Sequence, residues 1–185
     1  MAIMEIRNHW LSGATRHLSP NMDERPENEI SLIVVHGISL PAGHLGTRFV
    51  EALFLNELDT SSHPDFADLD GVRVSSHLMI RRNGEVLQFV PFDRRAWHAG
   101  ESSYEGRSRC NDFSIGIELE GTDQRPYRQE QVARLIAVCD LLMAHYDIPK
   151  GAICRHSDIA PGRKSDPGPV FPWSDFRNQL GAPVK

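Results

Sequence analysis

The chain has 185 residues, a length that fits one domain with a substantial hydrophobic core. Hydrophobic residues make up 40% and charged residues 24% of the chain, as in an ordinary globular protein. The formal net charge is −5 and no basic block stands out, so we expect no nucleic acid as a partner.

The N-terminal stretch and the cysteines indicate the compartment. Residues 1–16 contain neither an apolar run nor a small-residue cleavage site, so the sequence predicts no signal peptide. No window of the chain reaches the apolar length of a transmembrane helix, so we expect no membrane contact. The three cysteines are an odd number without paired spacing, which is typical of a reduced protein. We therefore expect a cytoplasmic protein.

The first third of the chain predicts a loop, a strand and a helix. Residues 1–30 are expected to form an irregular segment packed on the domain, because Ser19–Pro26 is rich in turn formers. Four consecutive apolar β-formers within Ser31–Ile38 predict a strand that is buried on both faces. The apolar residues of Thr47–Leu58 recur with a helical period and predict a helix.

A β-hairpin is predicted in the middle of the chain. The dipeptide Asn83-Gly84 lies between the apolar runs Leu78–Ile80 and Val86–Val90. Asn-Gly is the preferred dipeptide of a type I′ turn, so we expect that turn here.

The segment Phe113–Glu120 alternates strictly and predicts a strand. Its apolar residues face one side, and the other side carries Ser114, Gly116, Glu118 and Glu120. A solvated face would carry longer polar side chains in place of Gly116. We therefore expect open space beside this face of the strand, and we expect Glu118 to face a cleft.

The last third predicts two helices around a short extended segment. An apolar stripe predicts a helix over Arg128–Tyr146, with Cys139 as an inert core residue on it. Ala152–His156 is expected to be extended, and Trp173–Leu180 is expected to be a short helix. The order of elements predicts an α/β protein in which residues 1–185 form a single domain, with a central mixed β-sheet flanked by helices.

The loop Ile153–Pro169 contains the candidates for a metal site. It carries a histidine and several charged residues, and its prolines can hold a ligand still at low entropic cost. A catalytic zinc site needs three protein ligands and an open position for water. The loop can supply His156 and one carboxylate, either Asp158 or Asp166, with Cys154 as a weaker rival.

The third ligand must come from elsewhere in the chain. His36 stands near the end of the buried strand, and open sheets bind ligands beyond their strand ends, so His36 is the best candidate. A satisfied core histidine is the alternative interpretation of that residue. No H-E-x-x-H helix is present, which excludes the thermolysin-like proteases.

Two further charged residues fit the chemistry of amide hydrolysis. Zinc lowers the pKa of water to about 7, and a carboxylate such as Glu118 can carry the proton to a leaving amine. Lys164 would repel a metal ion, so its expected role is to meet negative charge that develops on a substrate. Trp97 is either a platform for a sugar ring or a core tryptophan.

Six motifs, in order along nearly the whole chain, resemble those of the AmpD-type family of cytosolic N-acetylmuramoyl-L-alanine amidases. They are Ser19–Pro26, Val34–Pro41, Ser75–Arg82, Arg95–Gly100, Cys110–Asp123 and His156–Pro169. The family trims anhydromuropeptides in cell-wall recycling. Its fold is shared with phage lysozyme-type amidases and peptidoglycan-recognition proteins.

The resemblance implies roles for particular residues. It places Zn²⁺ on His36, His156 and Asp166, and catalysis on Glu118 and Lys164. It also implies that the substrate-binding residues are Trp97, Arg73, Arg109 and Ala160. The expected substrate is a small muropeptide, cleaved between the lactyl group of (anhydro-)N-acetylmuramic acid and L-alanine, and the expected state is a monomer.

The chain departs from the family pattern at two positions. Gly37 stands where the family reads Asn, and Arg155 stands where it has a small residue. The broader fold family often uses a tyrosine on the hairpin strand, where this chain has Ser76 or His77, so Glu118 is the expected proton carrier. The alternative functions are a binding module without catalysis and a lytic amidase that acts on intact cell wall.

Overall fold

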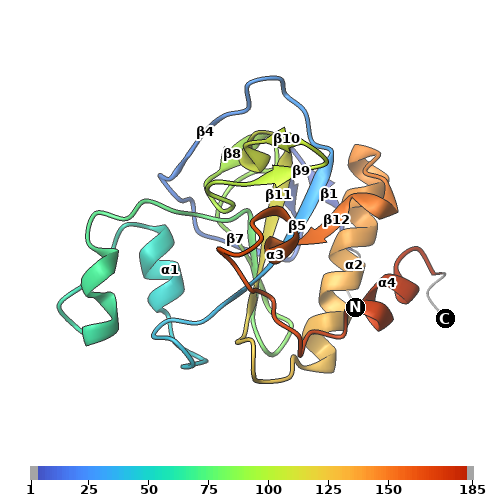
Figure 1. The fold of residues 1–185 in the computed structure, drawn as a ribbon. Coiled ribbons are helices and arrows are strands. Elements are labelled where there is room, and N and C mark those ends of the chain that lie inside the picture. Colours follow the sequence, from blue (N-terminus) through green and yellow to red (C-terminus); the bar gives the residue numbers. More distant parts are fainter. Residues whose placement is uncertain (1–3, 183–185) are drawn as a thin grey trace.

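The computed structural model describes residues 4–182, and its centre is a six-stranded mixed sheet (Figure 1). Strands β5 (Leu32–Ile38) and β11 (Ser114–Glu120) pair in parallel in the middle of this sheet, and β6 (Leu78–Ile80) and β7 (Val86–Gln88) pair antiparallel. The strands across the sheet, in spatial order, are β12 (Ile153–Arg155), β5 (Leu32–Ile38), β11 (Ser114–Glu120), β6 (Leu78–Ile80), β7 (Val86–Gln88) and β3 (Thr15–Arg16). The predicted mixed sheet is confirmed.

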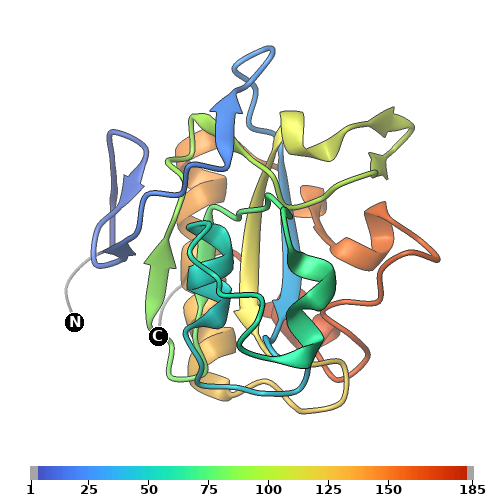
Figure 2. The ribbon, with the colours of Figure 1, turned by 90° about the vertical axis from the view of Figure 1, so that its left-hand side faces the viewer.

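Helices cover the two faces of the sheet. The long helix α2 (Gln129–Tyr146) lies on one face, and α1 (Phe49–Phe54) and the 3-10 helix η1 (Pro64–Leu69) lie on the other (Figure 2). The core cluster that includes α2 contains Ile115, Ile117 and Leu119 of β11. A second cluster joins α1 to Met79 and Leu87. Because side chains alternate along a strand, Gly116 and Glu118 face the α1 side.

Shorter elements surround this framework. The other helices are η2 (Cys110–Asp112), η3 (Lys150–Ala152), α3 (His156–Ile159) and α4 (Trp173–Gln179). Three small antiparallel pairs are β1 (Ile6–Arg7) with β2 (Trp10–Leu11), β4 (Met22–Glu24) with β8 (Arg94–Ala96), and β9 (Ser103–Tyr104) with β10 (Arg107–Ser108). Among residues 4–182, no helix has the length and apolar character needed to cross a membrane.

Three local predictions differ from the structure. The expected irregular segment 1–30 contains the four short strands β1 to β4, and residues 1–3 lie outside the described part. Helix α1 ends before Leu58, because Asn56 has a left-handed φ of 61°. The predicted type I′ turn is wrong, because that turn needs a positive φ at both central residues and only Gly84, with a φ of 82°, has one. The Arg81 backbone N donates to the Glu85 carbonyl oxygen at 2.9 Å. This is a three-residue hairpin loop with glycine in the left-handed position.

A buried arginine ties the N-terminal segment to the sheet. Arg25 is 3% exposed, and its guanidinium donates to backbone carbonyl oxygens of Phe92, Asn111, Asp112 and Ser114. Burial lowers the pKa of Arg25 to about 10, so the side chain stays charged at neutral pH. The motif Ser19–Pro26 therefore holds together segments that are far apart in the sequence.

We predict that Arg25→Met destabilises the protein by about 3 kcal/mol, because several buried carbonyl groups lose a charged donor at once. The free energy of unfolding in urea measures this. The matched control is Arg48→Met, since the Arg48 side chain is 84% exposed, and it should change stability by less than about 0.5 kcal/mol. Equal stability of the two variants would contradict the assigned role.

Candidate active site

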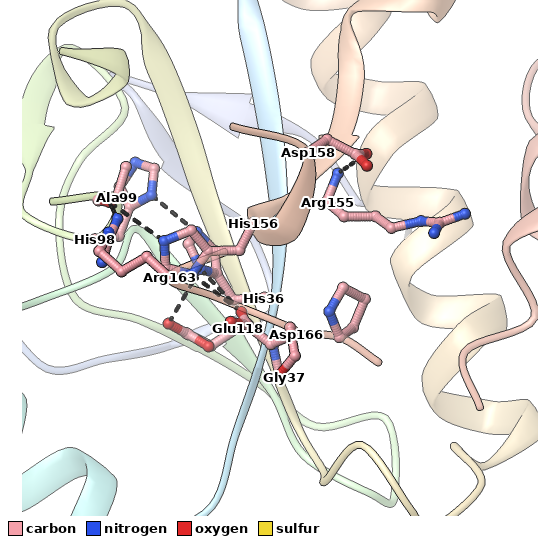
Figure 3. Close-up of polar contacts among 12 residues, drawn as sticks. His36, Gly37, His98, Ala99, Glu118, Arg155, His156, Asp158, Arg163 and Asp166 are labelled. Carbon is pink, nitrogen blue, oxygen red and sulfur yellow. Dashed lines mark hydrogen bonds and ion pairs between the residues drawn. The ribbon is translucent and has the colours of Figure 1, made fainter. Parts of the chain in front are cut away.

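Two histidines and one aspartate converge on the α1 side of the sheet (Figure 3). His36 comes from β5, His156 begins α3, and Asp166 lies in the loop after α3. One ligand atom from each of the three lies within 4.8 Å of the others. His36 Nδ1 is 2.9 Å from His156 Nδ1 and 3.4 Å from Asp166 Oδ2, and His156 Nδ1 is 3.1 Å from Asp166 Oδ2.

These separations fit a metal ion. Ligands at 2.0–2.1 Å from a tetrahedral zinc lie about 3.3 Å from one another, close to the three observed distances. Two imidazoles and a carboxylate form a donor set that zinc prefers. His156 Nε2 lies 3.2 Å from the Ala99 carbonyl oxygen and donates to it, so the lone pair of neutral His156 is on Nδ1, the atom that faces the cluster.

The structure brings Asp166 into the cluster and leaves its sequence rivals outside. The Gly37 backbone N donates to Asp166 Oδ2 at 3.2 Å. Burial acts to raise the pKa of Asp166, but the adjacent imidazoles of His156 and His36 outweigh it and hold that pKa below its usual range. The Asp158 carboxylate instead accepts from the Arg155 backbone N at 2.9 Å (Figure 3). Cys154 is buried in β12 and does not join the cluster.

Glu118 lies beside the cluster because of strand register. It pairs with His36 across β11 and β5, so both side chains stand on the same face of the sheet. His36 lies near the C-terminal end of β5, as expected. Glu118 Oε1 is 3.9 Å from His36 Nδ1, and the buried Oε2 has no hydrogen-bond partner. Burial and the Asp166 charge raise the pKa of Glu118 well above its ordinary value, while Lys164 acts in the opposite direction.

A cleft of about 840 Å³ opens beside Asp166. Its lining includes Gly37, Thr122, Arg125 and Lys164. Lys164 is exposed, and its charge acts to lower the pKa of both His36 and Glu118. A cation thus stands at the open side of the cluster, where a substrate can enter.

His98 is a residue of the site that the sequence analysis did not identify. His98 Nδ1 is 2.9 Å from His36 Nε2, and His98 Nε2 is 3.1 Å from Ser114 Oγ. A Cβ atom at position 116 would lie 2.6 Å from His98 Nδ1, so the glycine makes room for this ring. The small face predicted on β11 therefore accommodates the His98 imidazole. Burial lowers the pKa of His98 well below its usual value, so the ring is neutral.

The four predicted substrate-binding residues lie outside the lining of this cleft. Trp97 is half-buried, and its backbone N donates to Ser75 Oγ at 3.1 Å. Arg73 and Arg109 are exposed. Ala160 is buried, and its carbonyl oxygen accepts from the backbone N of Arg163 and of Lys164. The substrate-binding role of the four stays a prediction.

The two departures from the family pattern have local explanations. A Cβ atom at Gly37 would overlap Tyr127 Oη and lie 3.3 Å from Pro167 Cα, so Tyr127 occupies the space that a larger residue would need. The Arg155 guanidinium lies 5.0 Å from the centre of the Trp173 ring and points away from the cluster (Figure 3). His77, which directly precedes the hairpin strand β6, is fully buried, and its Nδ1 accepts from the Gly116 backbone N.

Comparison with known proteins identifies related chains. A family model described as N-acetylmuramoyl-L-alanine amidase matches residues 26–169. The 1,6-anhydro-N-acetylmuramyl-L-alanine amidase AmpD of Escherichia coli K12 is 53% identical over 176 residues, which cover 94% of this chain and 96% of the relative. AmpD of Haemophilus influenzae is 43% identical over 180 residues, covering 96% and 98% of the two chains.

Comparison with solved structures also finds amidases. A crystal structure of a selenomethionine AmpD derivative superposes with a TM-score of 0.93 at 50% identity, covering 96% of this chain and 99% of that one. AmiD of E. coli, in complex with its substrate anhydro-N-acetylmuramic acid-L-Ala-D-gamma-Glu-L-Lys, superposes with a TM-score of 0.61 at 31% identity, covering 97% and 66%.

Proposed function

This chain belongs to the N-acetylmuramoyl-L-alanine amidase family, as an AmpD-type member, and we propose that it is a zinc enzyme of cytoplasmic peptidoglycan recycling. Its substrate is 1,6-anhydro-N-acetylmuramic acid carrying a stem peptide, and the amide between the lactyl group and L-alanine is cleaved. The observation that carries the proposal is the convergence of His36, His156 and Asp166 next to the unpartnered Glu118 carboxylate. The predicted cytoplasmic location and monomeric state belong to the same proposal.

The metal ligands are the three atoms that face one another. His36 Nδ1, His156 Nδ1 and Asp166 Oδ2 would hold the ion. Zinc, when bound, supplies a Lewis acid that lowers the pKa of water to about 7. The Gly37 backbone N–H and the Ala99 carbonyl fix the orientations of Asp166 and His156, respectively.

Glu118 moves the proton. Its Oε2 has no partner, so this oxygen is free to accept a proton from the water that attacks the amide carbonyl. Because burial raises the pKa of Glu118, the carboxylate is a stronger base than an exposed one. Glu118 then passes the proton to the nitrogen of L-alanine as the C–N bond breaks. The products are a lactyl carboxylate and a peptide with a free amino group.

Lys164 meets the negative charge that grows on the carbonyl oxygen during attack. It stands at the cleft beside Asp166, and its charge reaches Glu118 and His36. Removing a donor of this kind typically costs about 100- to 1,000-fold in rate. The retention of all three ligands, the base and the cation argues against a module that only binds peptidoglycan fragments.

The deciding experiment compares two substrates with and without metal. We predict that zinc-loaded protein releases the stem peptide from anhydromuropeptide much faster than from intact sacculi. A chelator should abolish the reaction and added zinc should restore it, because zinc would be held by only three protein ligands. Mass spectrometry of the products and elemental analysis of the protein measure this. A fully active protein without metal would rule the zinc mechanism out, and preferential cleavage of sacculi would favour the lytic amidase.

We predict that three variants separate metal binding from catalysis. Asp166→Ala should lose zinc together with activity, since one of three ligands is removed. Glu118→Gln should keep zinc and lose at least about 100-fold in kcat, the scale for a positioned acid–base group. Lys164→Ala should keep zinc and lose kcat more than binding, because its contact strengthens in the transition state. Loss of zinc from Glu118→Gln with retention in Asp166→Ala would reverse the assigned roles.

For substrate binding we predict that Trp97→Ala and Arg109→Ala raise KM for anhydromuropeptide while zinc content stays at the wild-type level. An aromatic face suits a sugar ring, and Arg109 and Arg73 suit peptide carboxylates. Ala160 belongs to the same proposed set. Steady-state kinetics measure the effect, with Arg48→Met as the exposed control. Unchanged kcat and KM in both variants would remove these residues from the substrate site.

A further inference from the structure

The outer nitrogen atoms of both histidine ligands contact one short loop. His36 Nε2 is 2.9 Å from His98 Nδ1, and His156 Nε2 is 3.2 Å from the carbonyl oxygen of the next residue, Ala99. Building on the proposed metal site, we propose that His98 is a positioning residue that fixes the ring orientation and the protonated nitrogen of His36 for metal binding. No catalytic step is assigned to it.

If His36 binds the metal through Nδ1, its hydrogen bonds allow only one arrangement of protons. His36 Nδ1 faces His156 Nδ1 at 2.9 Å and Asp166 Oδ2 at 3.4 Å, so the metal-binding lone pair of His36 must be on Nδ1. Neutral His36 then carries its proton on Nε2 and donates it to His98 Nδ1. His98 in turn carries its proton on Nε2 and donates it to Ser114 Oγ at 3.1 Å, a hydroxyl that can accept.

The position of the His98 ring is itself fixed. The backbone N–H groups of His98 and Ala99 donate to Asn111 Oδ1 at 3.1 and 2.8 Å. The ring lies against Gly116, where a Cβ atom would be only 2.6 Å from His98 Nδ1. Because a side chain at position 116 would displace the ring, the chain offers a second way to remove this contact without changing any polar group.

The contact predicts a measurable contribution to metal affinity. An outer-shell partner that fixes the tautomer and orientation of a histidine ligand typically contributes 10- to 100-fold, as an order of magnitude. His98→Ala should therefore weaken zinc binding by about that factor. The His98→Gln variant should bind zinc more tightly than the His98→Ala variant, because the glutamine amide oxygen can still accept a hydrogen bond from His36.

Zinc(II) titration against a chromophoric chelator tests the proposal on the full chain. The set comprises wild type, His98→Ala, His98→Gln, Gly116→Ala and the double variant Gly116→Ala with His98→Ala. Gly116→Ala alone should weaken zinc binding. In the His98→Ala background, where the ring is already absent, Gly116→Ala should have no further effect, so the effects of the two substitutions on zinc affinity should not be additive. Gly151→Ala is the matched control, since a Cβ atom there meets nothing within 4 Å, and its zinc affinity should equal that of wild type.

The outcomes separate this inference from the proposed function. A wild-type protein that binds no zinc would overturn the metal site and the inference with it. Tight zinc binding by wild type, with His98→Ala within twofold of it, would overturn the inference alone. If His98→Ala does not fold, Gly116→Ala and His98→Gln decide: zinc affinity equal to wild type in Gly116→Ala would overturn the role of His98.

Discussion

The parallel pairing of β5 with β11 is the constraint on which the candidate site depends. This register places His36 directly opposite Glu118, and it places Gly116 opposite Val34 on the same face. A shift of one residue would turn Glu118 toward α2 and replace it with an apolar neighbour, because side chains alternate along a strand. The same shift would expose to the cleft the apolar residues that now pack in the core, so the burial of Ile115, Ile117 and Leu119 maintains the geometry of the site.

Burial gives the site its electrostatic character. His36, Glu118 and His156 are all less than 10% exposed, yet each is an ionisable group. Burial lowers the pKa of His36 to about 4, which favours its neutral imidazole, and burial raises the pKa of Glu118, which makes its carboxylate a stronger base. The pKa of Asp166 is held low instead, because the two adjacent imidazoles outweigh the effect of burial on its carboxyl group. The fold therefore places the neutral imidazole of His36 beside the ionised carboxylate of Asp166, the states in which these two side chains bind a metal ion.

Local patterns in the sequence predict the elements of the fold and part of the site. Alternation in Phe113–Glu120 predicts β11 within one residue, and the apolar stripe predicts α2. Residue types also point to the candidate ligands, since His156 and two aspartates lie in one proline-rich loop, but the choice between Asp158 and Asp166 requires the resemblance to a family. Helix α3 contains Asp158 and ends before Asp166. The Asp158 carboxylate accepts from the Arg155 backbone N in the first turn of this helix, whereas the Asp166 carboxylate contacts His156. Contacts between distant segments, such as those of Arg25 and His98, leave no local pattern in the chain.

Glycines on β5 and β11, or directly after β11, connect the fold with the chemistry. Gly116 accommodates the ring of His98, while Gly37 and Gly121 accommodate the ring of Tyr127, since Cβ atoms at these positions would overlap the two rings. Tyr127 Oη in turn donates to the Pro167 carbonyl at 3.0 Å, next to Asp166. One aromatic side chain therefore fills the space beside Gly37 and holds the loop that carries a proposed metal ligand. The space at Gly37 is thus linked to Tyr127, and an asparagine introduced at position 37 alone would displace that ring before it could contact a substrate.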